Sequence, residues 1–142
     1  MRAVICEDQS ELRWMLEVML QRHGYEVFTY PDPQHCPLSS LAQCQCPAGT
    51  FCADAILSDV QMPGGNGIEF VETLIAKGCR CRNFGIMSGS WSEEERARAS
   101  SLGCMLLEKP FRIHQVFAWL ELVKSTISPE RSLLDFDKQP LE

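Results

Sequence analysis

The chain has 142 residues, with 13 basic and 19 acidic side chains and a formal net charge of -6. This length predicts one domain whose single core is stable without disulfides or metals. No basic cluster or aromatic platform indicates a nucleic-acid surface, so we expect no direct nucleic-acid binding. No apolar run approaches the roughly 18 residues of a membrane span, and the first strand begins too early for a secretion signal. We therefore expect a cytoplasmic protein without membrane contact.

In the first half of the chain, strand and helix patterns alternate. Short apolar runs bounded by turn residues predict strands, and apolar residues at three- and four-residue spacing predict helices. The expected elements, in order, are a strand at 3–6, a helix from Leu12 that ends at Gly24, a strand at 25–30, and at most a short helix at 38–44. The stretch 34–52 is otherwise irregular and rich in Cys, Pro, Ser and Gln.

The second half of the chain continues the alternation. The expected elements, in order, are a strand at 53–59, a helix capped by Asn66 and ended by Gly78, a strand at 83–88, a helix opened by the capping box Ser92/Glu95, a strand at 104–107, and a helix striped by apolar residues from Ile113 to Val123. The helix after Ser92 is polar almost all round, which makes it a candidate moving part. We expect residues 1–127 to form the domain and 128–142 a C-terminal tail.

This alternation predicts an α/β fold in which a doubly wound, five-stranded parallel sheet is covered on both faces through right-handed crossovers. In an open parallel sheet, functional groups collect at the carboxyl ends of the strands. Four of the expected strands end in reactive side chains, which are Glu7 with Asp8, Asp59, Ser88, and Lys109 before Pro110. The sequence therefore predicts one crevice that holds carboxylates, a hydroxyl and an ammonium group.

These groups suit the phosphorylation of a carboxylate, which needs a free nucleophile, cationic charge and hydrogen-bond donors for the phosphoryl oxygens. Asp59 is the candidate nucleophile. Asp8, helped by Glu7, can hold Mg²⁺, and the metal would also keep the clustered carboxylates ionised. Lys109 supplies a second cation, and Ser88 can donate a hydrogen bond to a phosphoryl oxygen. The predicted chemistry is a phosphoryl-accepting site.

The residues that carry this chemistry resemble the receiver domain of two-component response regulators over roughly residues 1–126. They are Glu7-Asp8, the segment 59–67, Ser88 and Lys109-Pro110-Phe111. The resemblance implies a flavodoxin-like fold with strand order 2-1-3-4-5. We expect a stand-alone response regulator, monomeric or homodimeric, that signals through protein contacts.

The resemblance also implies an activity and a metal site. The domain would accept a phosphoryl group on Asp59 from a histidine kinase or a phosphotransfer protein in a phosphorelay. Mg²⁺ would be bound by Asp8, Asp59 and the backbone carbonyl of Gln61, with Glu7 completing the acidic side. Such a domain phosphorylates itself from small donors and hydrolyses its own acyl phosphate, so it is a signalling phosphoacceptor rather than a turnover enzyme.

The position of the usual aromatic switch residue departs from the family pattern. The family usually has an aromatic switch residue three positions before the lysine, and here that position is Leu106. A leucine cannot report phosphorylation by swinging a ring inward. The family pattern still implies a downstream protein partner on the surface of the fourth helix, fifth strand and fifth helix.

Eight cysteines are many for a cytosolic domain, where cysteine clusters more often indicate metal or redox chemistry than disulfides. Two Cys-x-Cys pairs lie in loops that enter neighbouring strands, on the edge opposite Asp59, and they are Cys44/Cys46 and Cys79/Cys81. Four thiolates would suit zinc or an iron–sulfur centre. The hypothesis is a metal or redox site at these four residues, and the alternative is a set of independent free thiols.

Two other functions remain as alternatives. The first is a phosphorylation-independent protein-binding scaffold on the same fold, with the cysteine-based metal or redox site. The second is an aspartate-nucleophile phosphatase of the haloacid-dehalogenase type. Those enzymes place a second aspartate two residues after the nucleophile, and the glutamine at position 61 argues against a phosphatase.

Overall fold

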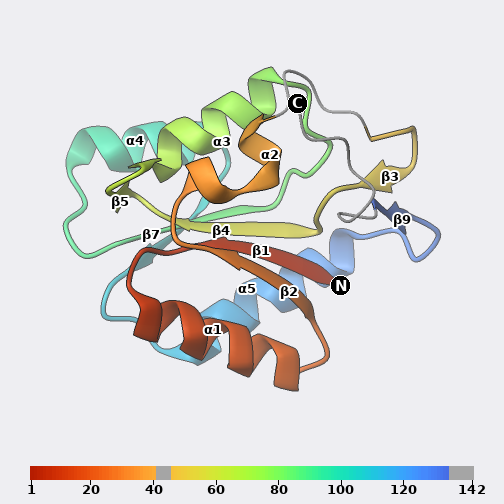
Figure 1. Ribbon diagram of the computed structural model, residues 1–142, viewed down its shortest axis with the longest axis horizontal. Coiled ribbons are helices and arrows are strands. Elements are labelled where there is room, and N and C mark those ends of the chain that lie inside the picture. Colours follow the sequence, from red (N-terminus) through yellow and green to blue (C-terminus); the bar gives the residue numbers. More distant parts are fainter. Residues whose placement is uncertain (41–45, 135–142) are drawn as a thin grey trace.

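A five-stranded parallel sheet forms the centre of the computed structural model, which describes residues 1–40 and 46–134 (Figure 1). Its strands are β1 (Arg2–Cys6), β2 (Glu26–Tyr30), β4 (Ala55–Asp59), β7 (Phe84–Ser88) and β8 (Met105–Glu108). They lie in the order β2-β1-β4-β7-β8, and every neighbouring pair is parallel. Counted within this sheet, the order is 2-1-3-4-5, so the predicted fold class is confirmed.

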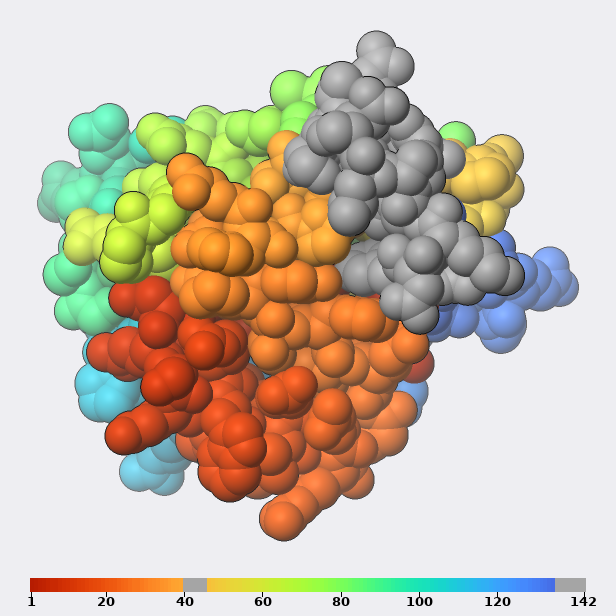
Figure 2. Space-filling model, viewed as in Figure 1, coloured from red at the N-terminus to blue at the C-terminus, as the bar shows by residue number. Residues whose placement is uncertain are grey.

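Helices cover both faces of the sheet, with α1 and α5 on one face and α2, α3 and α4 on the other (Figure 1). The helices are α1 (Ser10–Arg22), the short α2 (Pro37–Ser40), α3 (Gly67–Ala76), α4 (Glu93–Ser101) and α5 (Ile113–Thr126), with a 3₁₀ turn η1 (Pro33–His35). On the face seen in Figure 2, the segment of β2, η1 and α2 lies between α1 and α3. No helix in these ranges is long and apolar enough to cross a membrane.

The two faces of the sheet carry separate apolar cores because side chains alternate along each strand. In β1, Ala3 and Ile5 pack with residues of α1 and α5, such as Leu16 and Leu120. The alternate residues of β1 pack into the other core, beside α3. All five residues of β1, of β4 and of β7 are buried, as expected for central parallel strands with both faces covered.

Two helix N-termini carry the caps that the sequence predicts. The Asn66 side chain accepts hydrogen bonds from the backbone N–H groups of Ile68 and Glu69 at the start of α3. Ser92 and Glu95 form a reciprocal capping box at the start of α4. Within α4 only Ala99 is buried, so this helix contributes little to the core and its polar character is confirmed.

Four short strands lie outside the central sheet, and none of them is predicted from the sequence. The antiparallel pair β5 (Gln61–Met62) and β6 (Gly65–Asn66) forms a tight hairpin after β4. The parallel pair β3 (Thr50–Phe51) and β9 (Ser132–Leu133) joins the irregular stretch to the segment after α5. The expected short helix at 38–44 corresponds to α2, and residues 41–45 lie outside the described residues.

The segment after α5 is attached to the edge of the sheet where β1 and β4 begin. Arg131 donates two hydrogen bonds of 2.8 Å to the buried carboxylate of Asp54, just before β4. The Leu134 backbone N–H donates to the Phe51 carbonyl at 2.8 Å, and the Arg2 guanidinium donates to the Leu134 carbonyl. The predicted tail is therefore hydrogen-bonded to the domain as far as Leu134.

Replacing Arg131 by alanine removes both side-chain hydrogen bonds to Asp54. We expect the free energy of unfolding near pH 7 to fall by about 1–3 kcal/mol, the usual cost of leaving a buried charged group without its partner. Burial opposes ionisation of Asp54, but hydrogen bonds from Arg131 and the Arg2 backbone outweigh it and lower its pKa below the ordinary value. A carboxylate with a lowered pKa stabilises the fold at pH values above its ordinary pKa. This stabilisation is lost as the pH falls through the folded-state pKa.

Urea unfolding of both proteins across pH measures this effect. The difference between wild type and Arg131→Ala should be full near pH 7 and should shrink at pH values below about 4. Glu130→Ala, which changes the exposed neighbouring side chain, is the control and should unfold like wild type. An equal deficit at both ends of the pH range would contradict the assigned ion pair.

Candidate functional site

The carboxyl ends of four central strands meet at one edge of the sheet and bring the predicted residues together. Glu7 and Asp8 follow β1, Asp59 ends β4, Ser88 ends β7, and Lys109 follows β8. One carboxylate oxygen from each of Glu7, Asp8 and Asp59 lies within 4.8 Å of the others. Among the described residues, this is the one group of three or more potential metal ligands with such spacing.

The Lys109 side chain contacts two of these three carboxylates. Its Nζ donates to Glu7 Oε1 at 2.6 Å and lies 3.3 Å from Asp59 Oδ2. Glu7 is 0% exposed, and Asp59 is 8% exposed. One ammonium group thus faces two buried carboxylates, while Asp8 lies at the exposed side of the cluster.

Burial controls the protonation of this cluster. Desolvation raises the pKa of Glu7 and that of Asp59 above their ordinary values, although interactions with Lys109 lower both. Burial alone would lower the pKa of Lys109, but the hydrogen bond to Glu7 and the charge of Asp59 outweigh it, and the net change is upward. The lysine therefore keeps its proton, and additional positive charge near the carboxylates would favour their ionised forms.

Backbone geometry fixes the orientation of Asp59. Its Oδ1 accepts a hydrogen bond of 3.0 Å from the Val60 N–H, and its backbone carbonyl accepts one of 2.9 Å from the Ser58 hydroxyl. Gly67, at the start of α3, lies so close that a Cβ atom there would come within 2.0 Å of the Asp59 carbonyl oxygen. Only glycine fits this approach, so the last residue of the segment 59–67 sets the packing of α3 beside the site.

Ser88 and Lys109 are joined through the backbone. The Lys109 N–H donates to the Ser88 carbonyl at 2.9 Å, and the Ser88 hydroxyl accepts a hydrogen bond of 3.1 Å from the Ser90 N–H. The peptide bond between Lys109 and Pro110 is cis. Gln61, two residues after Asp59, begins β5 with an exposed side chain.

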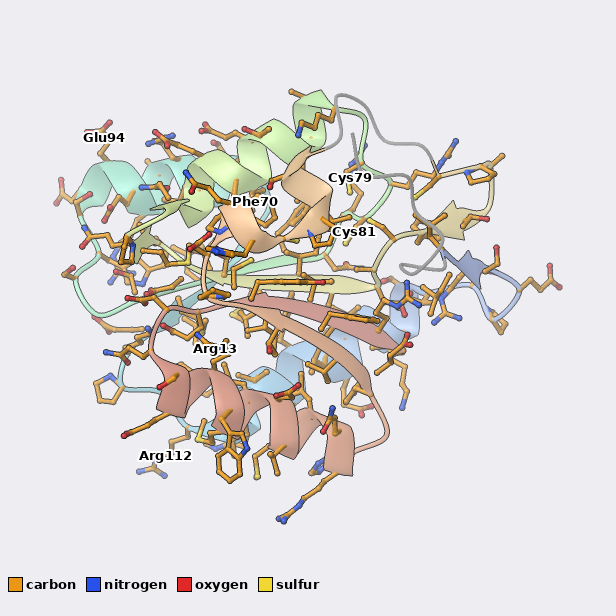
Figure 3. All side chains as sticks on the ribbon, in the orientation of Figure 1. Arg13, Phe70, Cys79, Cys81, Glu94 and Arg112 are labelled. Atoms are coloured by element: carbon orange, nitrogen blue, oxygen red, sulfur yellow. The ribbon has the colours of Figure 1, made fainter. Side chains whose placement is uncertain are left out.

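Sequence reasoning missed the groups that hold Glu7. Arg13 points from α1 toward the strand ends, where its Nη1 donates to the Glu7 carbonyl at 2.8 Å (Figure 3). The Gln9 N–H donates to Glu7 Oε2 at 3.0 Å, and the Glu7 N–H donates to the Tyr30 carbonyl at 3.0 Å. The position of Arg13, in the first turns of the helix after the acidic pair, is the one signal in the sequence that points to this role.

The environment of Leu106 contains an aromatic residue from another element. Leu106 is half-buried on β8 and packs against the core beneath α3 and α4. Trp91, in the loop between Ser88 and α4, packs against the same core and donates from Nε1 to the Leu107 carbonyl at 3.2 Å. The Arg96 guanidinium lies 5.6 Å from the centre of the Trp91 ring. The aromatic side chain beside β8 is therefore Trp91, which belongs to the loop after Ser88.

The cysteines of the proposed second site lie at the opposite edge of the sheet. Cys46, Cys79 and Cys81 are buried, and Cys44 lies outside the described residues. The Cys81 thiol donates to backbone carbonyls, at 3.6 Å to Asp54 and 3.8 Å to Asn83. The sulfur beside Cys79 is that of Cys52, which the sequence-based hypothesis does not include.

Comparison with known proteins identifies the family. The family described as the response regulator receiver domain matches residues 3–121. The phosphate regulon transcriptional regulatory protein PhoB of Escherichia coli K12 is 28% identical over 131 residues, which are 90% of this chain and 53% of PhoB. PhoB of Klebsiella pneumoniae is 27% identical over the same shares. The chain thus spans about half the length of the curated relatives it matches.

Solved structures agree in fold. The non-phosphorylated HemR receiver domain from Leptospira biflexa has a TM-score of 0.74 and 24% identity, covering 91% of this chain and 98% of that receiver-domain chain. The chemotaxis protein CheY4 of Vibrio cholerae has a TM-score of 0.68 and 26% identity, covering 86% and 97%. The chain belongs to the response regulator receiver domain family. Proteins of this family interact with histidine kinases or phosphotransfer proteins, and they typically bind Mg²⁺ in an acidic pocket.

Replacing Asp59 by asparagine should stabilise the metal-free protein. The folded-state pKa of Asp59 is raised, chiefly by burial, so its ionisation weakens the fold as the pH rises through that pKa. We expect Asp59→Asn to increase the free energy of unfolding near pH 7 by about 1 kcal/mol, a common gain when a functional group is removed. The gain should shrink as the pH falls through the folded-state pKa and vanish below about pH 3, where the wild-type carboxyl is protonated in both states.

Urea unfolding in the presence of a chelator measures the gain. Glu108→Gln removes an exposed carboxylate at the same end of the sheet and should leave stability unchanged. An Asp59→Asn protein that is less stable than wild type near pH 7 would show that the Asp59 carboxylate is not strained by its burial.

Proposed function

We propose that Asp59 accepts a phosphoryl group from a phosphohistidine of a histidine kinase or a phosphotransfer protein. The observation that carries this proposal is the position of the Lys109 ammonium, between the buried carboxylates of Glu7 and Asp59 at the carboxyl ends of the strands. A structural ion pair needs one carboxylate. A second carboxylate with a raised pKa beside the same cation is typical of a functional site.

The acidic group fits a divalent cation. Three carboxylate oxygens within 4.8 Å of one another, two of them on groups whose pKa is raised by burial, make a site where positive charge is favoured. We propose that Asp8, Asp59 and the Gln61 backbone carbonyl hold Mg²⁺, with Glu7 supporting the site from its bond to Lys109. When bound, Mg²⁺ would neutralise phosphoryl oxygens and keep the carboxylates ionised.

Three residues of the chain then have separate roles in the phosphoryl transfer. An ionised oxygen of Asp59 forms the new bond to phosphorus as the bond from phosphorus to the donor imidazole nitrogen breaks. The Lys109 ammonium faces the charge that develops on the phosphoryl oxygens. The Ser88 hydroxyl accepts a bond from the Ser90 N–H, which leaves its own proton to donate to a phosphoryl oxygen.

We propose that a downstream protein partner binds the surface formed by α4, β8 and α5. Within α4 only Ala99 is buried, so few apolar contacts oppose a movement of this helix. Trp91 joins the loop after Ser88 to the Leu107 carbonyl of β8. A displacement of Ser88 would therefore reach β8 through Trp91, and a downstream protein partner that contacts this surface would sense it.

Incubation with acetyl phosphate and Mg²⁺, followed by intact mass spectrometry, tests the proposal. Wild type should gain the mass of one phosphoryl group in an adduct that is labile to base, as an acyl phosphate is. Asp59→Asn should gain none, and a chelator should prevent the adduct in wild type. Glu108→Gln, the exposed control, should react like wild type.

Two outcomes would contradict the proposed function. An unmodified wild-type chain would favour the phosphorylation-independent scaffold. Release of inorganic phosphate over many rapid turnovers of a phosphate monoester would favour the phosphatase.

A further inference from the structure

Two buried cysteine side chains meet at the edge of the sheet opposite Asp59. Cys52 lies just before β4, and Cys79, labelled in Figure 3, lies just after α3. Both belong to the core on the face of the sheet that α3 covers. Each is 3% exposed. Asp59 is at the other end of β4, so this thiol pair is separate from the acidic site.

The two thiols are in contact but are not bonded. The two sulfur atoms are 3.9 Å apart, within hydrogen-bond contact, although 27 positions separate the residues in the sequence. A disulfide requires about 2 Å between the sulfurs, so they must approach each other by about 2 Å to form the bond. Cys46 also hydrogen-bonds to Cys52, whereas the Cys81 thiol donates to backbone carbonyls.

The two thiols differ in acidity. The hydrogen bond between Cys52 and Cys79 lowers the pKa of Cys79 below the ordinary value, although burial opposes this effect. Hydrogen bonds with Cys46 and Cys79, together with burial, raise the pKa of Cys52. Burial raises the pKa of Cys104 to about 11 and that of Cys81 to about 12. Cys79 is therefore the member of the pair that ionises first, and the thiolate is the reactive form of cysteine.

We propose that Cys52 and Cys79 form a reversible disulfide when the protein meets a hydroperoxide. The Cys79 thiolate attacks a peroxide oxygen, the O–O bond breaks, and the leaving oxygen takes up a proton as an alcohol or water. The Cys52 sulfur then attacks the sulfenic acid on Cys79. The S–S bond forms, the S–O bond breaks, and the departing hydroxide takes the Cys52 proton as water. Two thiols are oxidised and one peroxide is reduced, and a dithiol reductant restores the pair.

The disulfide would connect two segments that pack against each other without a covalent bond. Cys52 directly follows β3, which pairs with β9, and its backbone carbonyl accepts a hydrogen bond of 3.1 Å from Arg2. Oxidation would fix this segment, and the tail strand paired with it, to the loop between α3 and β7. The phosphoryl-accepting edge would keep its geometry, so the two modifications are expected to be independent.

A thiol pair suits these observations better than a metal centre. Among residues 1–40 and 46–134, no three thiols lie within 4.8 Å of one another. A structural zinc site needs four ligands in tetrahedral arrangement. A disulfide needs only the two sulfurs that are in contact here.

The test uses the reduced wild-type chain and hydrogen peroxide. After exposure, free thiols are blocked with an alkylating reagent, and the digest is examined by mass spectrometry without reduction. The expected product is a peptide pair linked through Cys52 and Cys79, which a dithiol reductant returns to free thiols. Cys52→Ser and Cys79→Ser should each abolish the link, and Cys104→Ser, at a buried cysteine elsewhere in the same core, should retain it.

Three outcomes would overturn the proposal. The first is wild-type protein in which both cysteines remain alkylatable after peroxide. The second is a dominant link that joins another cysteine, such as Cys46, to either residue. The third is stoichiometric zinc in the purified protein that protects these thiols from oxidation.

Because the mapping is done on wild type, it holds even where a serine variant fails to fold. Phosphorylation of Asp59 by acetyl phosphate is measured on the same samples and should be unchanged by oxidation.

Discussion

The contact between Lys109 and two buried carboxylates governs the arrangement of the functional edge. Glu7 has no exposed surface, and its carboxylate needs a cation and hydrogen-bond donors to remain ionised there. Lys109 supplies the cation at 2.6 Å, and the Gln9 N–H supplies a donor to the other oxygen. Because Glu7 already has its partners, the Lys109 ammonium can also face Asp59, at the longer distance of 3.3 Å. At this distance the ammonium can respond to a change in the charge on Asp59.

The fold provides the positions that this contact requires. Parallel strands place their carboxyl ends at one edge, so residues more than fifty positions apart in the chain meet without long side chains having to reach. Gly67 lets α3 begin against the Asp59 backbone, and the backbone bond from Lys109 to Ser88 fixes the two functional strand ends together. Burial raises the pKa of Glu7 and of Asp59, so we expect these two carboxylates to weaken the metal-free fold near neutral pH.

The strand ends could be predicted from the sequence because the signal is local. Apolar runs followed by Asp59, Ser88 and Lys109 reveal both the strand and the residue that it presents, and the helix caps are equally local. The mini-sheet of β3 and β9 could not be predicted, since two-residue strands carry no periodicity. The pairing of Arg131 with Asp54 and the contact of Cys52 with Cys79 depend on packing between distant segments. The convergence of Cys44/Cys46 with Cys79/Cys81 stays a hypothesis because Cys44 lies outside the described residues. The contact that the structure shows joins Cys79 to Cys52, a cysteine of another loop that has no Cys-x-Cys spacing.

Titration of Glu7 by carboxyl-carbon NMR, in wild type and in Lys109→Met without metal, tests most directly whether Lys109 holds the site together. Methionine has a similar length and no charge, so it removes the hydrogen bond while filling the space. In wild type the pKa of Glu7 should lie above its ordinary value of 4.5, because burial outweighs the effect of Lys109. In Lys109→Met it should rise further. A Glu7 that titrates at the same pH in both proteins would contradict the central role of this contact.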